Sequence, residues 1–248
     1  MLNPRCNLLL GQLTDSEIEP LLRSLRLVTL VDGQQLYGPG DLIDQVYFPI
    51  TALIAITKQM KDGASIDVAL IGEEGAAGFR GMTSRCPNTV RVTASGLAYL
   101  ISLRELQSIQ DWQLDHQTKN SAHPTTHWLT RLHAQAMQQV FDSIAQETVC
   151  AHFHSSKERV ARWLIARYEH GQPKFIEATH QKIADSLGFR RESVTNTLLK
   201  LDGIRCGRNH IEIHDFAHLE RQSCECHRAL IELNSAQLSL PFGIHLCT

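Results

Sequence analysis

The sequence predicts an α+β fold, with a strand-rich N-terminal half and a mainly helical C-terminal half. Three observations lead to this prediction. Short runs rich in Val, Ile and Thr fill the region 25–101, a pattern typical of an antiparallel barrel or sandwich. A long stripe of apolar residues at helical spacing follows Pro124. Two short amphipathic helices joined at Gly188 come later, and alternating Ile residues after them indicate a β-hairpin.

The N-terminal region is expected to open with a short helix and then to change to strands. Thr14 and Glu17 form a capping-box pattern ahead of apolar residues at helical spacing. Residues 107–122 are polar and allow no assignment. The punctuation by Asp-Gly and Gly-Pro-Gly turns places the predicted strands at 25–31, 45–50, 52–59, 65–71, 89–95 and 97–101.

Composition and charge favour a globular chain with two modest domains. The 248 residues are 43% hydrophobic and 20% charged. No apolar run suits a bilayer span and the start lacks a signal-peptide pattern, so a cytoplasmic location is expected. Seven scattered cysteines predict no disulfide framework and fit a reducing compartment.

The charges are unevenly distributed along the chain. Residues 1–150 carry 11 Lys and Arg against 15 Asp and Glu, whereas residues 151–212 carry 11 Lys and Arg against 7 Asp and Glu. A basic module on an acidic body is typical of a DNA-reading protein.

The apolar stripe after Pro124 predicts a helix of about five turns between the two halves. A helix of this length would be unusual as a surface element of a monomer, and the alternative is that it packs on its own barrel. Ser155 and Glu158 form a second capping box that starts the next helix and places the domain boundary near 150–155. The stripe includes Leu129, Leu132, Ala136, Val140 and Ile144.

Residues 179–201 have the pattern of a helix-turn-helix. Thr179 caps a first helix, and Gly188 ends it where a left-handed residue is cheapest. An Arg can pair bidentately with guanine, a Glu can accept a hydrogen bond from cytosine and an Asn can bind adenine. Arg191, Glu192 and Asn196 are therefore the candidate base readers. The alternative is an ordinary helical hairpin with a solvated charged face.

The predicted second helix also has an apolar inner face, made of Val194, Leu198, Leu199 and Leu201. Alternating Ile211 and Ile213 around a turn at Gly207 favour a hairpin wing, whose basic residues could contact phosphate without reading sequence. The full set of predicted DNA-contacting residues is Thr179, His180, Gln181, Arg190, Arg191, Glu192, Ser193, Thr195, Asn196, Lys200 and Arg208.

The stretch LGFRRESVTNTLLKL resembles the DNA-reading helix of the Crp/Fnr family of bacterial transcription regulators, with Gly188 and the Arg191-Glu192-Ser193-Val194 core in register. The segments LYGPGD and VYFP resemble the sensor domain of the same family, so the resemblance covers roughly residues 8–225. It implies an N-terminal double-stranded β-helix (a cyclic-nucleotide-binding-like jelly roll) at 1–122, a dimerisation helix at 123–152, a winged helix-turn-helix at 153–225 and a C-terminal tail at 226–248.

The resemblance also implies a function. Family members are homodimers that bind pseudopalindromic double-stranded DNA, so this chain is expected to do the same, with RNA polymerase as a partner and an unidentified small-molecule or redox effector. Many members have Arg where this chain has Asn196, which changes the expected DNA sequence. The connection LDGIRCGRN is shorter than the family pattern, so either the helix ends early at Gly203 or the wing is displaced. The alternative function is a ligand-sensing or protein-interaction module whose winged helix no longer binds DNA.

No cofactor is predicted. Family members that bind cyclic nucleotides use a Gly-Glu pair for the ribose and an Arg-Ser/Thr pair for the phosphate. Cys86-Pro87 aligns with the second pair and cannot hold a phosphate, which disfavours cyclic AMP and GMP. A single N-terminal cysteine disfavours an iron–sulfur cluster, and the absence of His before His116 disfavours haem. The matching Gly-Glu pair and a shifted clamp define a candidate effector pocket of Gly72, Glu73, Arg85 and Arg91.

Neither a metal site nor an enzymatic activity is predicted. Cys150-x-His152-x-His154 and Cys224-x-Cys226-His227 hold soft ligands, yet neither has a matching pair at zinc-ribbon spacing, and solvated histidines are expected. A cupin-like metal oxygenase would need His residues in the barrel, where the sequence has none. The sequence also lacks a nucleophile elbow, a P-loop and a dinucleotide fingerprint.

Overall fold

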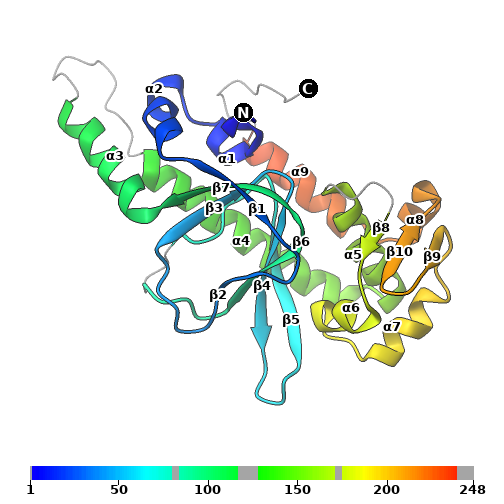
Figure 1. Ribbon diagram of the computed structural model, residues 1–248. Coiled ribbons are helices and arrows are strands. Elements are labelled where there is room, and N and C mark those ends of the chain that lie inside the picture. The colour runs from blue at the N-terminus through cyan, green and yellow to red at the C-terminus, as the bar shows by residue number, and fades with distance from the viewer. Residues whose placement is uncertain (1, 80–83, 117–127, 171–174, 239–248) are drawn as a thin grey trace.

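A computed structural model describes residues 2–79, 84–116, 128–170 and 175–238 (Figure 1). The N-terminal half is a barrel built from antiparallel sheets, one with the strand order β1-β7-β3 and the other with the order β2-β6-β4-β5. The strands are β1 (Arg26–Leu30), β2 (Gln35–Tyr37), β3 (Gln45–Pro49), β4 (Leu53–Gln59), β5 (Ser65–Ile71), β6 (Thr89–Ala94) and β7 (Gly96–Ser102).

Alternating side chains explain why these segments pair as sheets. Ile54, Ile71 and Val92 are almost fully buried in a cluster that also includes residues of β1 and β7, so it joins the two sheets. The six strands predicted from the sequence are confirmed. The sequence pattern did not predict β2, because its three residues are too few to show an alternation.

Short helices close one end of the barrel. The capping box of Thr14 and Glu17 is confirmed at the start of α2 (Asp15–Ile18). That helix is shorter than predicted, because Pro20 lacks an N–H and a 3-10 turn follows instead. Much of the polar region after Leu106 belongs to α3 (Leu103–His116), and α1 spans Leu8–Gly11. The expectation of unpaired cysteines is confirmed for five residues, whereas Cys6 is disulfide-bonded.

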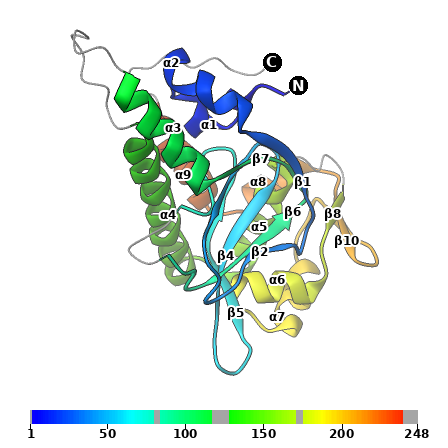
Figure 2. The ribbon, with the colours of Figure 1, turned by 60° about the vertical axis from the view of Figure 1, so that its left-hand side comes forward.

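Helix α4 (Trp128–Phe153) runs along the barrel and reaches the C-terminal domain (Figures 1 and 2). One face is buried, and its residues Trp128, Leu132 and Ala136 pack in a core with the N-terminal helices and strands β3 and β7. The other face is apolar yet exposed, and includes Met137, Phe141, Ile144 and Val149. Among the helices in the described ranges, none is both long and apolar enough to span a membrane.

The C-terminal half begins at the capping box of Ser155 and Glu158, which is confirmed. A small sheet of order β8-β10-β9 lies beside a helical core, in which Val160, Leu164 and Ile183 are fully buried. Helix α9 then packs back against α4 and α5. The elements are α5 (Ser156–Glu169), β8 (Phe175–Glu177), α6 (His180–Leu187), α7 (Arg191–Leu198), β9 (Ile204–Cys206), β10 (His210–Ile213), α8 (Phe216–Arg221) and α9 (Cys226–Leu238).

Candidate nucleic-acid interface

Helices α6 and α7 form the helix-turn-helix unit. The Thr179 hydroxyl accepts a hydrogen bond from the backbone N–H of Lys182 at 3.1 Å and starts α6. Gly188 ends α6 with φ of +69°, in the left-handed region where any side chain would be strained. Helix α7 begins three residues later, at Arg191. The cap and the turn predicted from the sequence are both confirmed.

The outer face of α7 is polar and open to solvent. Arg191, Glu192 and Asn196 are exposed, and none of them forms an ion pair with another described residue. The inner face is narrower than predicted, because Leu199 is 82% exposed. Val194 and Leu198 are four residues apart and share one side of the helix, whereas Leu199 lies on another side and caps it.

Two of the predicted DNA-contacting residues hold the two helices together. His180 Nδ1 lies 2.8 Å from Thr195 Oγ1, and both side chains are half-buried. The Thr195 hydroxyl also donates to the Arg191 carbonyl at 3.0 Å. The hydrogen bond between His180 and Thr195 fixes the angle of α7 relative to α6. The other members of the predicted set are exposed on the same unit or on the hairpin after it, namely Thr179, Gln181, Arg190, Ser193, Lys200 and Arg208.

The β9–β10 hairpin forms the predicted wing despite the short connection. Helix α7 ends at Leu198, and Gly203 turns the chain with φ of +84° at a point where a side chain would meet the Asp215 carbonyl. The first of the two predicted alternatives, an early end of the helix, is therefore what the structure shows. Ile211 is buried, and Arg208 lies at the exposed tip of the hairpin.

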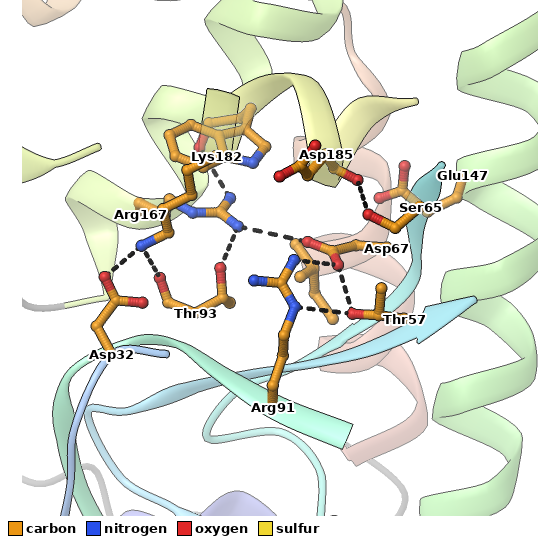
Figure 3. Close-up of polar contacts among 12 residues, drawn as sticks. Asp32, Thr57, Ser65, Asp67, Arg91, Thr93, Glu147, Arg167, Lys182 and Asp185 are labelled. Atoms are coloured by element: carbon orange, nitrogen blue, oxygen red, sulfur yellow. Dashed lines mark hydrogen bonds and ion pairs between the residues drawn. The ribbon is translucent and has the colours of Figure 1, made fainter. Parts of the chain in front are cut away.

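A polar network joins the barrel to the helix-turn-helix domain (Figure 3). Arg91 donates to Asp67 at 2.9 Å and to Thr57 at 3.0 Å, within the barrel. Arg167 of α5 approaches the same Asp67 at 3.9 Å and donates to Thr93 at 2.5 Å. Asp67 therefore lies between one arginine of each domain.

Helix α6 makes a second group of contacts with the barrel, and Figures 1 and 2 both show it beside one end of β5. Lys182 forms an ion pair with Asp32 and also donates to the Thr93 carbonyl. The Ser65 hydroxyl donates to the Asp185 carbonyl at 3.1 Å. Burial lowers the pKa of Lys182, and the bond to Asp32 opposes that effect. The helix-turn-helix unit is thus docked on the barrel.

A cavity of about 340 Å³ lies between the barrel, α4, α5 and α9. Its walls combine apolar residues with charged groups that include Glu73, Glu147, Arg162 and His170. Burial raises the pKa of Glu73 and lowers the pKa of His170. A cavity of this size, with many polar and charged groups in its walls, suits a small polar ligand. Glu73 is the member of the predicted effector set that lines it.

The other predicted effector residues are not brought together. Val90 and Val92 face the barrel core, so Arg91 between them points outward and is bound by Asp67. Arg85 is exposed and donates to the Gly40 carbonyl. The structure therefore does not place the two arginines of the predicted shifted phosphate clamp around one site. The sequence motif could not reveal which face of the strand carries each residue. Gly72 packs against the ring of His170, at the edge of the cavity.

Most of the predicted dimer residues face the chain's own barrel. Leu132 and Ala136 are each 1% exposed, so they are not available to a partner. Leu129 is half-buried against the same core and Val140 against the core between the two sheets, while Ile144 is 39% exposed. The apolar stripe in the sequence is broad enough to cover two faces of α4, and one of these faces packs on the barrel. The exposed face is centred on Met137 and Phe141 instead.

Together, these features define a winged helix-turn-helix DNA-binding domain, connected by a long helix to a β-barrel of jelly-roll type. Residues 158–222 match the family of Crp-like helix-turn-helix domains. These residues are therefore a Crp-like helix-turn-helix domain, and the chain is a DNA-binding transcription regulator.

Solved structures share the fold over 80–82% of this chain at low sequence identity. FixK2 from Bradyrhizobium japonicum is 14% identical, with a TM-score of 0.59 over 81% of this chain and 98% of that chain. The c-di-GMP responsive global regulator CLP from Xanthomonas campestris is 15% identical, with a TM-score of 0.61 over 82% and 100%. A Crp/Fnr-family regulator from Thermus thermophilus is 19% identical, with a TM-score of 0.59 over 80% and 98%. Identities this low show a common fold. No curated protein sequence matches the chain.

Proposed function

We propose that this regulator binds DNA as a homodimer and reads a pseudopalindromic site by placing α7 of each copy in successive major grooves. The observation that carries the proposal is the outer face of α7. It presents two charged side chains and an amide, all exposed and free of ion pairs among the described residues. Helix α6, capped and bonded to α7, holds this face in a fixed orientation.

The residues of the unit divide by the kind of contact they offer. Arg191 suits guanine, Glu192 suits cytosine and Asn196 suits adenine. Phosphate contacts supply affinity and position the protein without reading sequence. We assign that role to Thr179, His180, Gln181, Arg190, Ser193, Thr195, Lys200 and Arg208, where His180 and Thr195 act partly by holding the two helices together.

Dimerisation is assigned to the exposed face of α4. Met137, Phe141 and Ile144 are 40%, 65% and 39% exposed. Their spacing of four and then three residues is that of a coiled-coil seam. A twin helix packed here would cover an apolar surface that the chain's own barrel leaves bare.

The signal is assigned to the region between the domains. The cavity touches the barrel, α5 and α9, so a ligand held there would change how the DNA-binding domain docks on the sensor domain. We retain the division into a sensor domain at 1–122, a dimer helix at 123–152 and a DNA-binding domain at 153–225. RNA polymerase is the proposed protein partner.

A selection of genomic DNA fragments with purified protein tests the proposal. We expect enrichment of a pseudopalindromic motif by the native chain, with affinity falling steeply as salt rises, because phosphate contacts release counterions. The double variant Arg191→Ala/Glu192→Ala should lose the motif and keep weak, salt-sensitive binding.

The matched control is Arg104→Ala, which removes an exposed arginine from α3 in the sensor domain. It should leave the enriched motif unchanged. If the double variant enriches the same motif as the native chain, α7 does not read bases. If the native chain binds no DNA at any salt concentration, the alternative function applies, a ligand-sensing or protein-interaction module.

A further inference from the structure

A cluster of sulfur and nitrogen ligands lies where α4 meets the C-terminal helix. Cys150 is near the end of α4 and His154 directly follows it, whereas Cys224 and Cys226 come from the start of α9 and the turn before it. One ligand atom from each of the four lies within 4.8 Å of all the others. The three cysteines are buried and the histidine is half-buried.

Two of the distances within the cluster are close to those of a tetrahedral zinc site. Cys150 Sγ lies 3.6 Å from Cys224 Sγ, and Cys226 Sγ lies 3.4 Å from His154 Nδ1. With Zn–S bonds of about 2.3 Å and Zn–N bonds of about 2.05 Å, the edges of a tetrahedron are about 3.8 Å and about 3.6 Å. Four protein ligands around one ion leave no position open, which is typical of a structural site rather than a catalytic one.

The surroundings also fit a metal. His154 turns Nδ1 toward Cys226, and its Nε2 lies 3.3 Å from the Glu225 carboxylate. A metal-binding histidine usually donates its second ring N–H to such a carboxylate, which fixes the tautomer.

The net charge of a zinc centre here would offset the charge of a buried arginine beside it. A zinc ion with three thiolates and a neutral imidazole carries a net charge of −1. Arg159 is 8% exposed and close enough to Cys150 and Cys224 for their charges to interact, and it makes no ion pair with a described carboxylate. A buried guanidinium is costly without a counter-charge, and the carboxylate that acts on Arg159, Glu147, is already paired with Arg162. Arg162, the other nearby cation, already pairs with Glu147 at 2.5 Å.

We propose that Cys150, His154, Cys224 and Cys226 bind one structural zinc ion, which joins the end of the long helix to the C-terminal helix. The site would fix the junction between α4 and the DNA-binding domain, because α5, the first helix of that domain, begins two residues after His154. This inference stands apart from the proposed DNA reading.

The sequence holds the signal in two halves. Cys150 and His154 are four residues apart, so they share one face of a helix, and Cys224 and Cys226 flank a single residue. Neither half has zinc-ribbon spacing and about seventy residues separate them, so the spacing alone predicts no metal site. Of the neighbouring histidines, His152 is exposed and His227 is bonded to Glu169.

Metal analysis of the full-length chain tests the proposal. The protein is purified without a histidine tag or chelator, and zinc per chain is measured by plasma mass spectrometry. We expect one zinc ion per native chain, and at least a tenfold lower content in Cys226→Ser and in His154→Gln. The matched controls are Cys206→Ser and His152→Gln, which change an exposed cysteine and an exposed histidine outside the cluster and should keep the zinc.

A second measurement covers the case in which the ligand variants fail to fold. Native protein stripped with a chelator and then titrated with Co²⁺ should show the visible bands of tetrahedral cobalt with thiolate ligands. Native protein that holds no zinc and takes up neither Zn²⁺ nor Co²⁺ would overturn the proposal. So would iron with acid-labile sulfide, a Cys150–Cys224 disulfide in metal-free protein, or zinc retained by the double variant His154→Gln/Cys226→Ser.

Discussion

Arg167 shows at the scale of one residue how the two domains are held in a single arrangement. Its side chain is 2% exposed, stacks on the Trp163 ring at 3.5 Å and donates to Thr93 of the barrel. Burial lowers its pKa to about 9, and the nearby Asp67 carboxylate acts against that effect. A buried charge pair adds little net stability, since desolvation offsets the attraction. The pair does disfavour any other docking of the two domains, because Arg167 would then be buried without Asp67 and Thr93.

His170, beside the cavity, should make stability depend on pH. Burial lowers its pKa, opposed by Glu74 and Glu169 and reinforced by His227 and Arg167. Below its ordinary value of about 6.5 the unfolded chain binds a proton that the folded chain resists, so the free energy of unfolding falls as pH falls. His170→Gln should reduce that fall between about pH 7.5 and about pH 5.5, as measured by urea unfolding.

The control for this prediction is His152→Gln, which removes an exposed histidine. It should keep the pH dependence of the native chain. If native protein and His170→Gln lose the same stability on acidification, His170 does not carry this dependence.

At the scale of elements, capping residues are the best-predicted features. Ser155 illustrates the energetics. Its hydroxyl accepts from the Glu158 N–H, and the Glu158 carboxylate accepts from the Ser155 N–H at 2.8 Å. Ser155→Ala should lower the free energy of unfolding by about 1 kcal/mol, the usual cost of losing an N-cap. Chemical denaturation measures it. Ser108→Ala, an exposed serine inside α3, should change stability far less, and equal losses in both variants would contradict a capping role.

Local signals therefore account for much of what the sequence could predict. Thr179 acts through its own hydroxyl and Gly188 through its own backbone conformation, so their positions fix the ends of α6 without knowledge of the rest of the fold. Arg91 and Leu132 depend on which side of a strand or helix meets the core, and tertiary packing decides that. The cysteine cluster is harder still to predict, since its two halves meet only when α9 folds back on α4.

At the scale of the whole molecule, α4 connects every part of the proposed mechanism. One face packs on the barrel, its end carries the cysteine cluster, and the opposite face is free. Two copies joined along that free face would hold two recognition helices at a fixed separation. The separation would be set by α4 and by the docking of α6 on β5, not by the recognition helix itself.

This arrangement predicts the effect of a charge on the free face. Phe141→Glu places a carboxylate at the centre of the proposed apolar seam, where burial without a partner is costly, so the variant should sediment as a monomer. Each monomer keeps its recognition helix, so binding to a half-site should be unchanged. Linking two binding units raises affinity by roughly a hundredfold or more, and affinity for the full palindrome should fall by that factor.

The control is Met60→Glu, which charges an exposed apolar residue at the β4–β5 turn and should change neither the dimeric state nor the affinity for the palindrome. A Phe141→Glu protein that remains dimeric would place the dimer interface elsewhere, whereas a monomer with full affinity for the palindrome would mean that the two half-sites are read independently.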